Sequence, residues 1–529
     1  DWQFDGTIYE FRIWNGALTP IYTAVAATAG PGVVITNTTL QSLSLLVTTT
    51  SMIGSQAQQA TAQGNFLQVA GVPLNGFATN WTSSKPSVLT VNSSGLITAQ
   101  SGGTATVSAT VNGVTATSPT ITVSSTPPTP TQSPSNETVI VHDGAVFSVV
   151  AVGGNLNYQW SFNGTPISGA TSTNLTLVNV AFTQAGTYSV LVSNSAGTTN
   201  LSATLTVIPA SLQHEWSFNE SSGTTAFDSI EGSNITLQGT TSLGGGVVTM
   251  PGGGGNYAQF PNGMLSTYSN SITIETWLTD TAGSTWARAW SFGGSTTGPN
   301  GGNGQNNYID LIPTAGASGG LWTEFRQSYN TQDVIDYGNT PMPTGVEQYI
   351  TVTYNASLQT CDIYSNGVQI AHGTGIATTP ASFGFTYNNY LGFDQWNDAT
   401  FTGSFDEMRI WNGVVSQLYL NASSVAGPAI VINNLTPTSA SLTAGPGVII
   451  TGTEQAAVTV QLPQTGSADL QATADATNWI SSNPSVLTVN SSGLITGVAI
   501  GSATVSATVN GVTATSGIIT VTGPQTLLH

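Results

Sequence analysis

A segment of 39 residues occurs twice in this chain, about 400 positions apart. Residues 79–117 match residues 477–515 at 32 positions. Upstream of each copy lies a second matched pair, residues 4–16 (FDGTIYEFRIWNG) and 401–413 (FTGSFDEMRIWNG). The long strand-rich stretch before the second pair has no counterpart before the first. A fixed period is typical of tandem arrays, so we expect the chain to be part of a longer array that spans distance, displays modules or builds a fibre.

Charged side chains are scarce in this chain of 529 residues. Its length predicts three to five domains, because one hydrophobic core cannot serve so many residues. Only 5% of the residues are charged, Lys85 is the single lysine, and the net charge is −19. Nucleic-acid binding needs clustered lysine and arginine, so we expect no nucleic-acid partner.

Cys361 is the only cysteine, which excludes an internal disulfide. It lies in the strand-like sequence TCDIYSNG, and we expect it to be a buried packing residue rather than a reactive thiol. No run of 18 or more apolar residues is present, so no membrane-spanning segment is expected here, and any signal or anchor would lie outside this sequence. The Gly/Thr/Val-rich composition is typical of secreted proteins, and we expect an extracellular or cell-surface location.

Alternation of small polar and apolar residues predicts β-strands along most of the chain. Residues 105–110 and 114–117 alternate around Asn112-Gly113, a two-residue hairpin turn, and Asn510-Gly511 repeats this turn. Turn residues recur about every 8 to 12 positions, and no segment shows helical periodicity. We therefore predict an all-β fold of tandem β-sandwiches, with the Pro-rich residues 126–136 as a semi-rigid linker.

The two copies of the long repeat resemble the bacterial immunoglobulin-like group 2 domain. The resemblance rests on the order Trp, Ser-Ser-x-Pro-Ser-Val-Leu-Thr-Val, then Asn-Ser-Ser-Gly-Leu-Ile-Thr. It assigns residues 28–125 and 428–523 to two such domains, which in that family usually serve as spacers or stalks. It also implies core tryptophans and interstrand glycines at Trp81 and Trp479, and at Gly95 and Gly493.

Residues 137–208 resemble an immunoglobulin-like domain. Trp160 and Tyr188 stand where that family places a core tryptophan and the tyrosine two residues before its second cysteine. The two expected cysteine positions are Val149 and Val190. The resemblance therefore implies a disulfide-free module in which apolar packing replaces the bridge.

Residues 211–427 resemble the laminin-G-like, concanavalin-A-like jelly roll. The segments that carry this resemblance include ITIETWLTD and the closing NYLGFDQWNDATFTGSFDEMRIWNG. Residues 1–27 resemble the same closing strands, and we expect them to belong to a truncated laminin-G-like domain. Such strands should pair poorly within this chain and leave open edges that need a partner.

No residue pattern in the chain indicates catalysis. The related laminarinase-type hydrolases need paired carboxylates on one strand, and the nearest strand here offers only Glu275. The simpler interpretation of Glu275 is an edge or hydrogen-bonded carboxylate. The histidines are scattered, and no nucleophile-elbow motif accompanies them, so we expect no catalytic residue and no enzyme.

Calcium is the one metal that the resemblance suggests. Laminin-G-like domains often hold Ca²⁺ near the junction of the first and last strands, and this hard cation prefers carboxylate and carbonyl oxygens. The matching positions are Asp228, Asp406 and Glu407. The alternative is that Asp406 and Glu407 bind loops or pair with Arg409.

Carbohydrate binding is the other use that the resemblance suggests. Exposed tryptophans stack on sugar rings, and Trp396 in the loop GFDQWND is the first candidate, followed by Trp286 and Trp322. The alternative is that these tryptophans belong to the core. The Gly/Asn-rich residues 293–307 are expected to form a long loop.

These observations favour an extracellular structural or adhesive repeat protein that forms a surface stalk, fibre or filament. Its expected partners are neighbouring copies or modules of the same protein. One alternative is a carbohydrate-binding adhesin that binds glycans through the laminin-G-like domain. The other is a non-catalytic part of a large secreted hydrolase.

Overall fold

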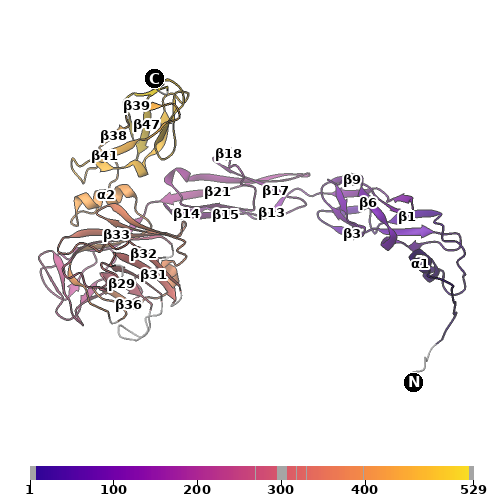
Figure 1. The fold of residues 1–529 in the computed structure, drawn as a ribbon, viewed down its shortest axis with the longest axis horizontal. Coiled ribbons are helices and arrows are strands. Elements are labelled where there is room, and N and C mark those ends of the chain that lie inside the picture. Colours follow the sequence, from indigo (N-terminus) through magenta and orange to yellow (C-terminus); the bar gives the residue numbers. More distant parts are fainter. Residues whose placement is uncertain are drawn as a thin grey trace, which may run out of the picture. The chain divides into compact units, whose positions relative to one another are not determined.

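The computed structural model of the protein describes residues 7–268, 270–294, 307–316, 319–328, 331–396 and 398–523. The chain divides into two compact units. The first comprises residues 1–137, 146–176 and 185–206, and the second comprises residues 138–145, 177–184 and 207–529. Strands dominate both units (Figure 1), which confirms the predicted all-β class of tandem sandwiches.

The first group 2-like domain, residues 28–125, is built from small antiparallel and mixed sheets. Their strand orders are β1-β4-β5, β11-β10-β6, β2-β12-β9 and β3-β8-β7. Buried Val, Ile, Leu and Ala side chains fill the space between them. The strands are β1 (Ser42–Leu46), β2 (Ser51–Ile53), β3 (Ala57–Gln59), β4 (Thr61–Asn65), β5 (Val72–Pro73), β6 (Thr79–Ser83), β7 (Leu89–Val91), β8 (Leu96–Ala99), β9 (Gly103–Ala105), β10 (Val107–Val111), β11 (Val114–Thr117) and β12 (Ile121–Ser124).

The second group 2-like domain repeats this topology strand for strand. Its sheets have the orders β38-β41-β42, β43-β47-β48, β39-β49-β46 and β40-β45-β44. The duplication in the sequence is therefore a duplication of the fold. The strands are β38 (Ser439–Thr443), β39 (Gly447–Ile449), β40 (Thr453–Gln455), β41 (Ala457–Gln461), β42 (Leu470–Gln471), β43 (Thr477–Ser481), β44 (Leu487–Val489), β45 (Leu494–Gly497), β46 (Gly501–Ala503), β47 (Val505–Val509), β48 (Val512–Thr515) and β49 (Ile519–Thr522).

Both predicted hairpins and the predicted turn glycine are confirmed. β10 pairs with β11 across Asn112-Gly113, and both turn residues have positive φ, as a type I′ turn requires. Gly95 has φ +84°, and a Cβ there would lie 2.7 Å from the Trp81 ring. Trp81 packs against the core but is only partly buried, so it covers the core rather than filling it.

The immunoglobulin-like domain has the predicted aromatic core. Trp160 and Tyr188 are buried, and Phe147 stacks on Tyr188 with ring centroids 5.0 Å apart. Val149 and Val190, at the expected cysteine positions, are also buried. The strands are β13 (Thr129–Gln132), β14 (Glu137–Ile140), β15 (Ala145–Ser148), β16 (Val150–Val152), β17 (Asn157–Phe162), β18 (Thr165–Pro166), β19 (Asn174–Leu177), β20 (Gly186–Asn194) and β21 (Gly197–Ile208).

The Pro-rich segment is not a linker throughout, as residues 126–136 had been predicted to be. Residues 129–132 form β13, which pairs antiparallel with β16. The register shifts after Pro130, which lacks the N–H that a regular ladder would use. A short, irregular two-stranded ladder of this kind tolerates proline, so composition alone misplaced this boundary.

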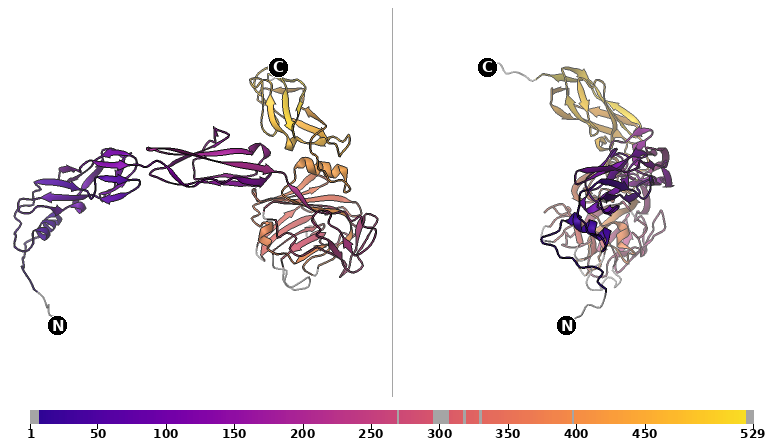
Figure 2. Two further views of the ribbon diagram at one scale, coloured as in Figure 1. Left: turned by 180° about the vertical axis from the view of Figure 1, so that it is seen from behind. Right: turned by 90° about the vertical axis from the view of Figure 1, so that its right-hand side faces the viewer.

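The laminin-G-like domain, residues 211–427, consists of two large sheets packed face to face (Figures 1 and 2). Its strands are β22 (Ser211–Trp216), β23 (Thr225–Ala226), β24 (Ile235–Leu237), β25 (Ser242–Gly244), β26 (Val247–Pro251), β27 (Ala258–Gln259), β28 (Ile272–Asp280), β29 (Trp290–Gly293), β30 (Tyr308–Ile312), β31 (Trp322–Ser328), β32 (Thr331–Asp336), β33 (Gln348–Asn355), β34 (Thr360–Ser365), β35 (Val368–Thr374), β36 (Asn388–Leu391) and β37 (Thr402–Asn412). Aromatic and aliphatic side chains from both sheets form the core between them, and Cys361 is buried in it.

The first of these sheets, the closing sheet, has the order β25-β26-β37-β28-β33-β34-β35, and β22 also pairs with β37. β37 is therefore hydrogen-bonded along both sides. Ser211, where the domain begins, lies directly opposite Asn412, where β37 ends. The second sheet, the cleft sheet, has the order β23-β24-β27-β36-β29-β30-β31-β32.

Two α-helices occur in the described residues, although the sequence was expected to show none. They are α1 (Pro20–Ala29) and α2 (Gln417–Ala426), each capped by a hydroxyl at its start and followed by a glycine with positive φ. Both are short and carry no charge, so they depend on packing rather than on intrinsic propensity. α2 lies across the outer face of the closing sheet (Figure 1), and Leu418, Tyr419 and Leu420 are buried there.

Residues 7–18 form no strand, although they match the end of β37 in sequence. Their apolar side chains lie in solvent, with Phe11 79% and Ile13 85% exposed. The opening residues of the matched segment, including Phe4, lie outside the described residues. The description of residues 1–27 as closing strands of another domain stays a prediction.

Candidate functional site

Several charged side chains that are buried or half-buried gather on the outer face of the cleft sheet of the laminin-G-like domain. Strand alternation explains why. On β30, Ile309 and Leu311 point into the core, while Tyr308 and Asp310 face outward. On β31, Phe325 points inward, and the neighbouring Glu324 and Arg326 face outward.

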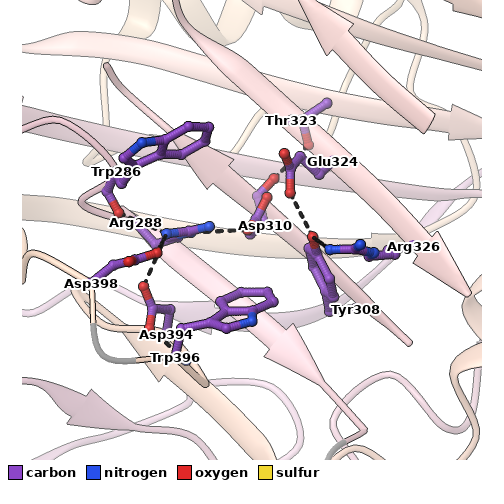
Figure 3. A network of polar contacts seen from close by, with 10 residues as sticks. All are labelled: Trp286, Arg288, Tyr308, Asp310, Thr323, Glu324, Arg326, Asp394, Trp396 and Asp398. Atoms are coloured by element: carbon purple, nitrogen blue, oxygen red, sulfur yellow. Dashed lines mark hydrogen bonds and ion pairs between the residues drawn. The ribbon is translucent and has the colours of Figure 1, made fainter. Parts of the chain in front are cut away.

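Register brings these outward side chains together. Asp310 lies opposite Glu324, and Tyr308 lies opposite Arg326. Tyr308 Oη donates a hydrogen bond to Glu324 Oε2 at 2.6 Å, and Arg326 Nη1 donates to Tyr308 Oη at 3.3 Å. The result is a continuous polar row across two adjacent strands (Figure 3).

Arg288, two residues before β29, is the centre of the site. Its Nε lies 3.1 Å from Asp310 Oδ2, and its Nη1 lies 3.1 Å from Asp394 Oδ2 and also contacts Asp398. Asp394 and Asp398 come from the loop after β36. One guanidinium therefore holds three carboxylates from two segments, β30 and the loop after β36, and Arg288 is only 4% exposed.

Two tryptophan rings enclose the same guanidinium (Figure 3). The Arg288 Cζ atom lies 4.8 Å from the ring centre of Trp396 and 5.6 Å from that of Trp286. Trp396 and Tyr308 form an edge-on aromatic pair with ring centroids 4.6 Å apart, and Trp286 and Trp322 form another at 5.5 Å. The three tryptophans suggested for sugar binding therefore lie in one place.

The groups around Arg288 line a cavity of about 240 Å³. Asp398 also lines a neighbouring cavity of about 710 Å³, whose aromatic wall is Tyr257 stacked on Phe393. The two cavities thus have Asp398 as a common lining residue. We call this combined surface the Arg288 cleft; its residues are Trp286, Arg288, Tyr308, Glu324, Arg326, Trp396 and Asp398 on one side, and Gly253, Gly254, Gly255, Tyr257, Ser284, Phe393, Ala399, Thr400 and Thr402 on the other.

Burial changes the proton affinity of the carboxylates in the cleft. It raises the pKa of Asp310 well above the ordinary range, and the nearby Glu324 carboxylate adds to this effect. It also raises the pKa of Asp394 to about 6, although the Arg288 guanidinium acts in the opposite direction. Burial alone would lower the pKa of Arg288, but the surrounding carboxylates outweigh it and raise that pKa, so Arg288 stays charged.

The raised pKa of Asp394 predicts an unusual pH dependence of stability. Because the folded state binds this proton more tightly than the unfolded state, stability should fall as the pH rises from about 4 to about 6, by on the order of 3 kcal/mol. The midpoint of thermal unfolding of the laminin-G-like domain, followed by calorimetry, should therefore be higher at pH 4.5 than at pH 7. Asp394→Asn should flatten this slope; an unchanged slope in that variant would contradict the assignment.

Glu275 lies at a second polar cluster, on the outer face of the closing sheet beneath α2. It is not on an edge: β28 pairs with β33 and β37 on its two sides. Its Oε1 accepts a hydrogen bond from Tyr349 Oη at 2.5 Å, and its Oε2 accepts from Trp411 Nε1 at 2.5 Å and Tyr419 Oη at 3.0 Å. Glu275 is thus the hydrogen-bonded carboxylate of the simpler interpretation.

The suggested calcium residues do not fit a metal site. Asp228 accepts hydrogen bonds from His214 Nδ1 at 2.8 Å and from four backbone N–H groups. Burial tends to raise its pKa, but these hydrogen bonds outweigh burial and lower it. Glu407 binds Arg409 Nε at 2.5 Å, and Asp406 is half-buried beside it.

Within the described ranges, no three His, Cys, Asp or Glu side chains are arranged to hold a metal ion. The Gly/Asn-rich loop expected at residues 293–307 lies almost wholly outside the described residues, as does His529. None of the helices in the described part of the chain has the length and apolarity that a membrane crossing needs.

The sequence suggested the tryptophans of the cleft but missed its charged residues. A usable signal was present. Only 5% of the residues in this chain are charged, yet the sequences YIDLI and WTEFR place Asp310, Glu324 and Arg326 at positions that alternate with apolar residues. Arg288 lies just before the preceding strand, β29. Alternating charge on a strand indicates a face that does not belong to the core.

Two family models match parts of the chain. Residues 252–421 match the concanavalin A-like lectin/glucanases superfamily, and residues 446–519 match the bacterial Ig-like domain, group 2. The chain is thus a modular protein with these two kinds of domain, as the sequence predicted. Both kinds are typical of extracellular proteins. No curated protein matches the chain.

Solved structures resemble single parts of the chain. The titin M10 domain in complex with obscurin-like 1 is 22% identical, covers 16% of this chain and 97% of its own, and has a TM-score of 0.16. Domain 4 of AbnA, an extracellular arabinanase from Geobacillus stearothermophilus solved with arabinotriose, is 20% identical, covers 40% and 97%, and has a TM-score of 0.29. Extracellular domains 3–5 of Drosophila OTK are 16% identical, cover 32% and 63%, and have a TM-score of 0.17.

Proposed function

We propose that this chain is part of an extracellular adhesive protein that binds a neutral oligosaccharide in the Arg288 cleft. The observation that carries the proposal is the convergence of Trp286, Trp396, Tyr308 and charged groups on the lining of two neighbouring cavities, with Trp322 packed against Trp286. Aromatic surfaces that suit sugar rings, together with a few fixed hydrogen-bonding groups, are the usual composition of a small-molecule site. The group 2 and immunoglobulin-like domains would serve as spacers that display it.

The charges of the cleft favour a neutral ligand over an acidic one. Its two guanidinium groups, Arg288 and Arg326, face four carboxylates: Asp310, Glu324, Asp394 and Asp398. Three of them contact the Nε and Nη1 atoms of Arg288. A uronate or sulfated sugar would therefore meet net repulsion, whereas neutral hydroxyl groups can donate to the carboxylates and accept from the arginines.

We propose binding without hydrolysis. A retaining or inverting glycosidase needs one carboxyl free to donate a proton and a second free to act as nucleophile or base. Here Asp310 is fully buried and bound to Arg288, and Glu324 accepts the Tyr308 hydroxyl. Release of reducing sugar from a bound oligosaccharide by the whole chain would overturn this part of the proposal.

The test is binding of the whole chain to an array of neutral and acidic glycans, followed by calorimetry on the strongest neutral ligand. Trp396→Ala should lower the affinity about thirtyfold, because a central aromatic contact contributes about 2 kcal/mol. Phe227→Ala is the matched control, since Phe227 is an exposed aromatic residue of the same domain outside the cleft.

Three results would count against the proposal. Binding only to acidic glycans would contradict the charge argument. Equal losses in the two variants would place the ligand elsewhere. Absence of any glycan binding by the intact chain would leave a purely structural stalk or fibre as the better account.

A further inference from the structure

Residues 7–30 repeat the end of β37 and helix α2, including their internal contacts. Arg12 Nη2 donates a hydrogen bond to Pro31 O at 2.8 Å, as Arg409 Nη2 donates to Pro428 O at 2.6 Å. The Nε atom of each arginine also binds the glutamate two positions earlier, at 2.6 Å and 2.5 Å. The two segments therefore share a folded turn around an arginine.

The aromatic pair that follows is also repeated. The rings of Trp14 and Tyr22 have centroids 5.0 Å apart and an interplanar angle of 72°. The corresponding values for Trp411 and Tyr419 are 4.9 Å and 68°. In each segment the tyrosine lies on the helix and the tryptophan lies before it. The orientation of helix against strand end is thus preserved in residues 7–30, although no sheet is present there.

What residues 7–30 lack is the partner surface. Tyr419 and Trp411 donate hydrogen bonds to Glu275 on the neighbouring strand β28. The Tyr22 hydroxyl is buried, yet among the described residues no group accepts its proton. A carboxylate in the position of Glu275 would satisfy it.

The core-facing side chains are missing their partners too. The β37 residues Phe405, Met408 and Ile410 are fully buried between the two sheets. The residues at the matching positions are Ile8, Phe11 and Ile13, which are 68%, 79% and 85% exposed. In β37 a bulge at Asp406 brings the three matching positions to one face of the strand. Three large apolar side chains at such positions, all in solvent, are typical of an unoccupied docking strand.

We propose that residues 7–30 dock onto a laminin-G-like body that lacks its own closing strand. That body would resemble residues 211–400, leave open the strand position beside its β28, and carry a carboxylate at the Glu275 position to accept the Tyr22 and Trp14 donors. The laminin-G-like domain of a complete copy is not the partner. Its own β37 already occupies the position beside β28 and pairs with β26 on its other side.

The first test grafts residues 7–30 onto positions 404–427 of the whole chain. Among the core-facing residues of β37, the graft changes Phe405 to Ile and Met408 to Phe, which nearly conserves the volume buried between the sheets. Calorimetry should show cooperative unfolding of the laminin-G-like domain within about 5 °C of the original chain. The matched control is the same graft with aspartate at position 410, which should abolish that transition.

The second test supplies the strand separately. A labelled peptide of residues 4–30 is added while the whole chain without residues 401–427 refolds, and co-elution on a sizing column measures capture. Capture by this chain, with none by the complete chain and none of an Ile13→Asp peptide, supports the proposal, as does a folded graft alone. If the graft unfolds like its control and the peptide is not captured, the proposal is wrong.

Discussion

Replacing Glu275 with alanine is expected to lower the unfolding midpoint of the laminin-G-like domain by about 10 °C. The substitution leaves three buried donors without an acceptor and removes a carboxylate whose charge stabilises the buried Arg409 guanidinium. Uncovering a buried charge costs about 3 to 5 kcal/mol, and a domain of this size loses about 2 to 4 °C per kcal/mol. Differential scanning calorimetry of the whole chain measures the shift.

Two variants calibrate that result. Glu275→Gln keeps one oxygen acceptor and should cost clearly less than alanine. Glu231→Ala removes an exposed glutamate of the same domain and should change the midpoint by little more than 1 °C. An alanine variant at position 275 that unfolds like the original chain would show that the cluster under α2 adds nothing to stability.

Replacing Arg288 with leucine should lower the free energy of unfolding of the laminin-G-like domain by a similar amount, but only near neutral pH. Without the guanidinium, Asp310 and Asp394 remain buried as neighbouring carboxylates, and the loop after β36 loses its anchor. The expected loss is again about 3 to 5 kcal/mol at pH 7. Because both carboxyls can be protonated, lowering the pH to about 5 should recover much of the lost stability.

The matched rescue is the triple variant Arg288→Leu, Asp310→Asn, Asp394→Asn, measured by calorimetry at both pH values. It removes the unpaired charges together with the cation and should unfold at a higher temperature than Arg288→Leu alone at pH 7. Equal stability of the two variants would indicate that the tryptophan packing around Arg288, rather than its charge, holds the cleft together.

Local patterns in the sequence predicted the fold more completely than they predicted the site. The Asn-Gly hairpins follow from short-range alternation and turn chemistry, whereas the buried Trp160 and the closing strand were predicted from family resemblances. Helix α2 does not, because its ten uncharged residues are stabilised by packing on Tyr349 and Trp411 rather than by their own propensity.

The Arg288 cleft shows the limit of such patterns. Its residues come from segments spread between Gly253 and Thr402, and only the register of β30 against β31 brings Asp310 beside Glu324. Register depends on the whole sheet, which no single segment encodes. Trp396 could be named from its loop, but its contact with Arg288 could not.

The pairing of Ser211 with Asn412 has a mechanical consequence. Because β22 and β37 run antiparallel, the chain enters and leaves the laminin-G-like sandwich at adjacent residues. A pulling force applied to the two ends of the chain would act directly between Ser211 and Asn412, and the rest of the domain would carry little of it. The Arg288 cleft would bear little of this force and would keep its shape while the chain is stretched. Its shape would change only after β22 and β37 begin to separate at the Ser211–Asn412 pair.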